Sequence, residues 1–164
     1  MLNARTILLV IHIICAGLWI AQFFTTFIFE RLIRTHEGKP AELTLMLAQI
    51  KVSSIAGMIA GNGILLSGLG LLAVSHLGLL GIGGTITPPW LFIKQIIYII
   101  LLLIVFVGIN PIAIRLQNQI TAAANGAAAA TPEMRADLNR LRMIVYAHDA
   151  FVLINIILAV AKFN

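Results

Sequence analysis

The stretch Thr6–Phe29, TILLVIHIICAGLWIAQFFTTFIF, decides the class of this protein, because its 24 residues include no Lys, Arg, Asp or Glu. The hydrocarbon core of a bilayer is about 30 Å thick and needs roughly 20 apolar residues per helix. The stretch therefore predicts a transmembrane helix. Its apolar run exceeds the roughly 7–15 residues of a signal-peptide core and ends without a clear cleavage pattern, so we expect a retained span.

Three further segments are long and apolar enough to span a membrane: about Ser54–Val74, Trp90–Ile114 and Met143–Ala161. Of the 164 residues, 60% are apolar and 10% are charged, and the mean hydropathy is +1.03. Soluble domains are about 45–50% apolar and about 25% charged. The composition excludes a soluble enzyme and a disordered chain. We predict an all-α fold in which residues 1–164 form one domain, a polytopic four-helix transmembrane bundle.

Basic residues gather in two of the three connections between these spans. The first connection contributes Arg31, Arg34, Lys39 and Lys51, and the third contributes Arg115, Arg135, Arg140 and Arg142. The second connection, His76–Pro89, has no Lys or Arg, and the chain ends add only Arg5 and Lys162. Because positive charge favours the cytoplasmic side, we expect both termini to be extracytoplasmic. This use of charge accounts for the net +5 without a nucleic-acid partner.

The two basic connections carry signals for helices that project beyond the bilayer. Pro40 suits an early helical position, so Ala41–Ser53 is expected to lead straight into the second span. Thr131 is a good N-cap before a helix over Pro132–Ala161, which at 30 residues would be about 45 Å long. The Asn125-Gly126 pair predicts a turn in the Ala-rich segment before it. We expect helical cytoplasmic extensions of the bundle.

The second span is rich in glycine. Gly57 and Gly61 form a small-xxx-small pair, which lets another helix backbone approach closely. The pattern indicates helix packing, and the same lack of side chains would also leave room for a flat cofactor ring.

Polar residues inside the spans are functional candidates, because they are costly in a bilayer. His12 and Lys94 both follow the expected outer boundary by a few residues, at a depth of roughly 6–9 Å. Asn155 on the fourth span and Ser67 on the second approach the same level. The sequence therefore predicts one polar layer in the outer third of the bundle.

The pairing of His12 with Lys94 suits a porphyrin. Neutral imidazole is a strong haem ligand, so His12 is the candidate metal ligand and axial haem ligand. Lys94 would be a second ligand, a proton-transfer group or a partner for a propionate. The alternatives are an interhelical hydrogen bond for His12 and a snorkelling side chain for Lys94.

His148 and Asp149 form a second polar pair near the cytoplasmic start of the fourth span. We expect this pair to lie close to Glu30, Arg31 and Arg142 and to be solvated by lipid headgroups. The alternative is a second ligand site or a proton relay.

Three short motifs are similar to those of the bacterial flavin-independent protoporphyrinogen oxidases. They are the first-span stretch from Ile11 to Trp19 with its His-Ile-Ile start, Trp90-Leu91-Phe92-Ile93-Lys94, and the chain end Val160-Ala161-Lys162-Phe163. The same four-span plan occurs in copper-resistance D-type proteins and in related uncharacterised integral membrane proteins.

This resemblance implies a multi-pass protein of a bacterial inner (plasma) membrane, with haem b at the positions of His12 and Lys94. If the protein is an enzyme, the resemblance implies oxidation of a porphyrinogen, with His12 and Lys94 catalytic and electrons passed to quinone. The His148-Asp149 pair departs from the family pattern. A second hypothesis is a non-catalytic accessory subunit of a respiratory or photosynthetic complex, or a homo-oligomer. Copper handling is the weakest hypothesis, because the five methionines are scattered and Cu(I) prefers clustered sulfur.

Overall fold

The computed structural model describes residues 3–84, 87–126 and 129–161, and these residues fold almost entirely into helices. The elements are α1 (Ala4–Thr35), α2 (Ala41–Val74), α3 (Pro89–Leu103), η1 (Ile104–Ile109), α4 (Asn110–Asn125) and α5 (Pro132–Ala161). Within the described residues there is no β-strand, and the α2–α3 connection holds one isolated bridge. Four helices are long and apolar enough to cross a membrane: α1, α2, the continuous run Pro89–Asn125 and α5. The four predicted helices are confirmed.

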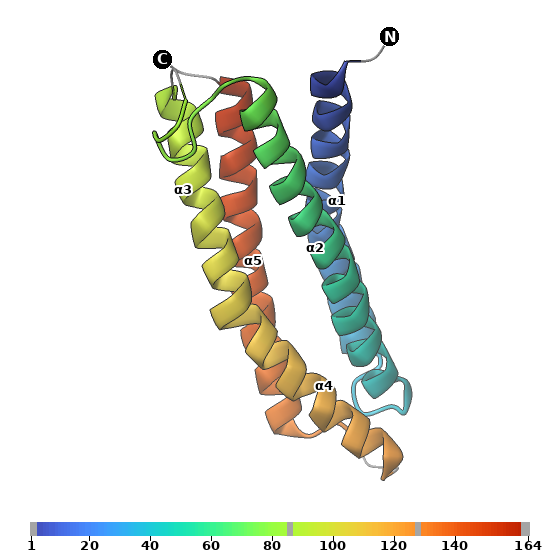
Figure 1. Cartoon of the computed structure of the whole chain (residues 1–164). Coiled ribbons are helices and arrows are strands. Elements are labelled where there is room, and N and C mark those ends of the chain that lie inside the picture. The colour runs from blue at the N-terminus through green and yellow to red at the C-terminus, as the bar shows by residue number, and fades with distance from the viewer. Residues whose placement is uncertain (1–2, 85–86, 127–128, 162–164) are drawn as a thin grey trace.

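The helices run along one bundle and form two closely packed pairs, α1 with α2 and α3 with α5 (Figure 1). The start of α1, the α2–α3 connection and the end of α5 lie at one end of the bundle, which we call the apical end (Figure 1). The other two connections lie at the opposite, basal end. The chain thus alternates between the ends in the order that the four-span prediction requires. Lys162 and Phe163, used in the sequence argument, lie outside the described residues.

Both predicted helical extensions are present at the basal end. Helix α2 begins at Ala41 and continues without a break into the second span. Helix α5 runs from Pro132 to Ala161, and the Thr131 hydroxyl caps it by accepting a hydrogen bond from the Met134 N–H over 3.2 Å. The break after Asn125 also falls where the Asn-Gly pair predicts it.

The helix that contains the third predicted span, Trp90–Ile114, continues to Asn125 through the wider turn η1. Proline has no N–H, and its ring collides with the carbonyl four residues earlier. Directly before Pro111, the Asn110 N–H bonds to the Val105 carbonyl, five residues back. This π-type turn absorbs the proline, and the helix bends between α3 and α4 (Figure 1).

The buried apolar side chains form two clusters. The larger one, which we call the basal core, joins residues of α1, α2, α4 and α5 at the basal end, with Met46, Leu116, Ile120 and Leu138 almost fully buried. The smaller, central cluster comprises Trp19, Ala60, Ile97, Leu101 and Val152. Around the central cluster, many large apolar side chains stay exposed on the outside of the bundle. Such a surface fits contact with lipid acyl chains.

Candidate functional site

The His12 side chain is held by a hydrogen bond between α1 and α2. Its Nδ1 lies 2.9 Å from the Ser67 Oγ. The imidazole is half-buried, and Ser67 is buried. The second predicted span therefore brings Ser67 to His12.

The hydrogen bonds of Ser67 decide which nitrogen of His12 carries the proton. The Ser67 hydroxyl donates its single proton to the Gly63 carbonyl, one turn earlier in α2. Its oxygen is therefore an acceptor toward His12, and Nδ1 of the neutral imidazole must be the donor. The lone pair of the ring is then on Nε2, the nitrogen that does not face Ser67. A histidine oriented in this way is suited to bind a metal through Nε2.

Lys94 on α3 is the charged group associated with this histidine. The two residues come from separate helices, and an electrostatic interaction links the Lys94 side chain to the His12 ring. Lys94 is half-buried, and none of the ion pairs formed among the described residues includes it. The site therefore combines an imidazole whose Nε2 does not face Ser67 with a lysine that has no carboxylate partner in the described chain.

Asn155 is not joined to this site by any hydrogen bond among the described residues. Its Oδ1 is buried and has no hydrogen-bond partner. The structure thus brings together His12, Ser67 and Lys94, and it leaves Asn155 as a separate buried acceptor on α5.

The expectation that headgroups solvate His148 and Asp149 is wrong, because the two residues are only 4% and 7% exposed. The His148 ring lies 5.3 Å from the Trp19 ring, centroid to centroid, beside the central cluster. Its Nδ1 is 3.2 Å from the Asp149 Oδ1, while His148 Nε2 and Asp149 Oδ2 have no protein partner. Helix rotation explains the error, because sequence position gives depth along α5 but not the direction in which the side chain points.

Glycine brings α2 close enough to α1 to hold His12 in place. A Cβ built at Gly63 would lie within van der Waals overlap of the Cys15 sulfur, and one at Gly57 would come within 3.1 Å of the Gln22 amide. At Gly61, by contrast, a Cβ would meet nothing within 4 Å. Gly57 thus lies against the Gln22 side chain of α1. Its expected partner Gly61 instead offers its carbonyl to the Tyr98 hydroxyl, which donates over 3.0 Å.

Other metal chemistry finds little support in the described residues. They contain no group of three His, Cys, Asp or Glu side chains that could hold a metal ion. Met58 and Met143 are 59% and 70% exposed, whereas Met46 and Met134 are buried in the basal core, so the thioethers are not gathered at one place.

Comparison with known proteins identifies no relative of this chain. No protein-family model matches the chain, and no curated protein or solved structure matches it at a significant level.

Proposed function

We propose that this protein binds a b-type haem or a related porphyrin within the membrane, at the side chains of His12 and Lys94. The observation that carries the proposal is the 2.9 Å contact between the His12 Nδ1 and the Ser67 Oγ, which leaves Nε2 as the nitrogen available to a metal. A haem needs only one or two protein ligands, so the site does not require the larger ligand cluster of a zinc or copper centre.

Lys94 supports a porphyrin over an isolated metal ion. A porphyrin carries propionate groups as well as its central metal, and Lys94 is a half-buried cation without a carboxylate partner in the described chain. An ammonium in a medium of low dielectric gains strongly from an anionic partner. In this proposal His12 would hold the porphyrin metal and Lys94 would hold a propionate.

The finer form of the proposal is a redox role similar to that of the flavin-independent protoporphyrinogen oxidases, in a bacterial inner membrane with both termini outside. Haem, when bound, supplies one-electron chemistry. Ser67 orients the ligand and holds its proton on Nδ1, while Lys94 neutralises negative charge on the porphyrin edge. Partner subunits or a second copy of the chain would bind on the exposed apolar surface.

The visible spectrum of the purified protein tests the proposal. We expect a Soret band from protein expressed with adequate haem supply, and at least about a tenfold loss of that band in His12→Ala. His36→Ala is the matched control, because His36 is in the exposed basal connection and its loss should leave the band unchanged. A colourless wild-type protein that reconstituted haem does not bind would refute the proposal. Stoichiometric partners on such a protein would favour the accessory-subunit hypothesis.

Removing the Ser67 hydroxyl tests the orientation of the ligand. Ser67→Ala leaves the His12 Nδ1 proton without its acceptor, so the ring can rotate or change tautomer. We expect haem affinity to fall about tenfold, in the range known for groups that orient metal ligands, with a shifted reduction potential in the protein that retains haem. An unchanged affinity and potential would show that Ser67 does not position His12.

A further inference from the structure

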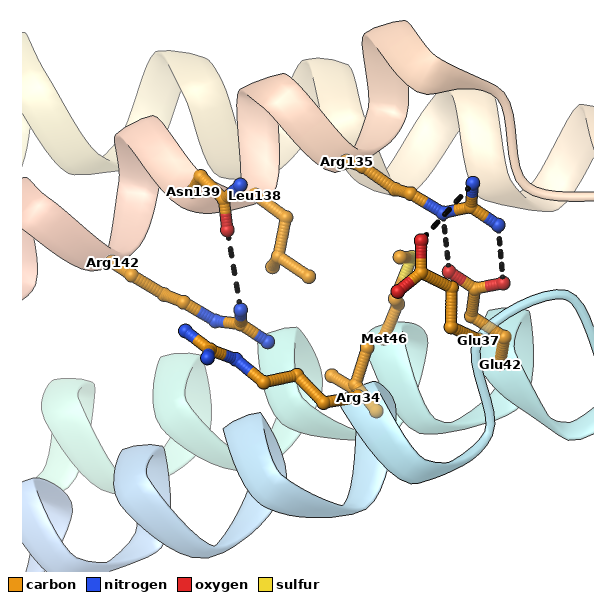
Figure 2. Close-up of a pocket in the computed structure, with 9 residues that line it drawn as sticks. Arg34, Glu37, Glu42, Met46, Arg135, Leu138, Asn139 and Arg142 are labelled. Atoms are coloured by element: carbon orange, nitrogen blue, oxygen red, sulfur yellow. Dashed lines mark hydrogen bonds and ion pairs between the residues drawn. The ribbon is translucent and has the colours of Figure 1, made fainter.

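A polar cavity of about 260 Å³ lies at the basal end, between the α1–α2 hairpin and α5. Nine residues line it: Ile33, Arg34, Glu37, Glu42, Met46, Arg135, Leu138, Asn139 and Arg142 (Figure 2). It belongs to neither the His12 site nor the His148 pair. A cavity of this size exceeds the space of a single water molecule many times over, so a small polyatomic ligand can enter it.

Arg142 is the feature of this cavity that calls for a ligand. Its side chain comes from α5 and is only 6% exposed, yet Nε and Nη2 have no hydrogen-bond partner among the residues that the structure describes. Its single protein bond runs from Nη1 to the Asn139 amide oxygen over 3.3 Å. A buried guanidinium with unsatisfied donors is costly unless an anion or another acceptor meets it.

A second arginine faces the first. Arg34 reaches into the cavity from α1, and its guanidinium group lies beside that of Arg142 (Figure 2). The carboxylate available to this pair is already engaged, because Glu30 accepts hydrogen bonds from Arg34 on one oxygen and from the Tyr146 hydroxyl on the other. Two guanidinium groups thus share one carboxylate, and this part of the cavity carries an excess positive charge.

The two carboxylates that line the cavity are held apart from the Arg34–Arg142 pair by a third arginine, which engages both of them. Arg135 donates to both oxygens of Glu42 over 2.7 and 2.8 Å, and it lies 3.5 Å from Glu37. Figure 2 shows this cluster at the other side of the cavity from the Arg34–Arg142 pair. The cavity is therefore divided into a closed acidic side and an open basic side.

We infer that the Arg34–Arg142 pair binds a phosphate-class oxyanion. Guanidinium groups match the tetrahedral oxygens of phosphate with paired, charge-assisted hydrogen bonds, and Arg142 Nε and Nη2 supply such a pair. The site also has the height of a headgroup layer, since Glu30 ends the apolar run of α1 and Arg142 precedes that of α5. The phosphate can belong to an anionic lipid headgroup or to a soluble molecule. The inference does not rest on haem binding.

Thermal unfolding of the delipidated protein in a nonionic detergent tests the site. One arm adds inorganic phosphate, with chloride at the same ionic strength as its control. The other adds dioleoyl phosphatidylglycerol, with dioleoylglycerol, which lacks the phosphate, as its control. We expect at least one phosphate-bearing probe to raise Tm beyond its control. A response to inorganic phosphate identifies a soluble source, and a response to the phospholipid alone identifies a headgroup.

The variants Arg142→Gln and Arg34→Gln should weaken that response by about tenfold in apparent affinity. Arg31→Gln is the matched control, because Arg31 is on the same helix end but stacks over the Phe27 ring outside the cavity. If Arg142→Gln does not fold, the exposed Arg34 decides the outcome. Equal Tm values for every probe and its control would overturn the inference, as would a full response in both cavity variants.

Discussion

Replacing Gly63 by valine is expected to lower the free energy of unfolding by about 3 kcal/mol, the upper part of the range for overpacked interiors. A Cβ at this position would overlap the Cys15 sulfur and come within 3.3 Å of the Cys15 Cβ. Cys15 is itself buried in the α1–α2 interface, so neither helix can yield without separating from the other. Thermal unfolding in detergent, followed by tryptophan fluorescence, measures the loss.

A matched alanine pair isolates the contact from the general cost of changing a membrane glycine. Gly63→Ala should destabilise the protein, whereas Gly61→Ala should not, because a Cβ at Gly61 meets nothing within 4 Å. Cys15→Ala combined with Gly63→Ala removes the sulfur and should recover most of the loss. Equal effects at the two glycines would contradict this account of the α1–α2 interface.

Replacing Arg135 by alanine is expected to lower Tm by about 5–10 °C. Glu42 is only 2% exposed, and both of its carboxylate oxygens accept hydrogen bonds from Arg135. Without Arg135 the carboxylate stays buried in the basal end with only the Gly38 N–H as a partner. Thermal unfolding at neutral pH measures this effect, and Arg140→Ala, which removes an exposed arginine of the same helix, is the control.

The pH dependence of the same variant tests the direction in which the pKa of Glu42 shifts. The hydrogen bonds from Arg135 hold the pKa of Glu42 below its usual value. In the wild-type protein this contribution to stability is full above the unfolded pKa of about 4.3 and is lost as the pH falls through the lower folded value. In Arg135→Ala, burial raises the pKa of Glu42 instead, so protonation should stabilise the variant. The Tm deficit of the variant should therefore shrink between pH 7 and pH 5. A Tm deficit that is constant over this range would show that the variant does not leave Glu42 as a buried carboxylate without a partner.

The architecture could be predicted from the sequence because hydropathy and capping act locally along the chain. The apolar run Thr6–Phe29 requires a membrane helix, and Thr131 marks the start of α5. Depth could also be predicted, since rise per residue is constant, and it places Ser67 near His12. The wider turn over Ile104–Ile109 was not predicted; it lets the helix accommodate Pro111, a residue that ordinarily ends a helix.

Contacts that depend on helix rotation could not be predicted in the same way. His148 and Asp149 point into the bundle, where the Trp19 ring lies 5.3 Å from the imidazole. The partner of Cys15 is Gly63, which lies outside the small-xxx-small pair. The Arg34–Arg142 pair joins residues more than 100 positions apart, so no local sequence pattern predicts it.

The uneven distribution of buried side chains has a mechanical consequence. The larger basal core and the smaller central cluster both join the two helix pairs, whereas the His12–Ser67 hydrogen bond nearer the apical end stays within the α1–α2 pair. The two helix pairs are therefore held together from the basal end to the central cluster, and they can separate most easily at the apical end. Because His12 is on α1 and Lys94 is on α3, a bulky ligand that enters from the lipid would separate the apical ends of the two pairs while the basal core stays packed.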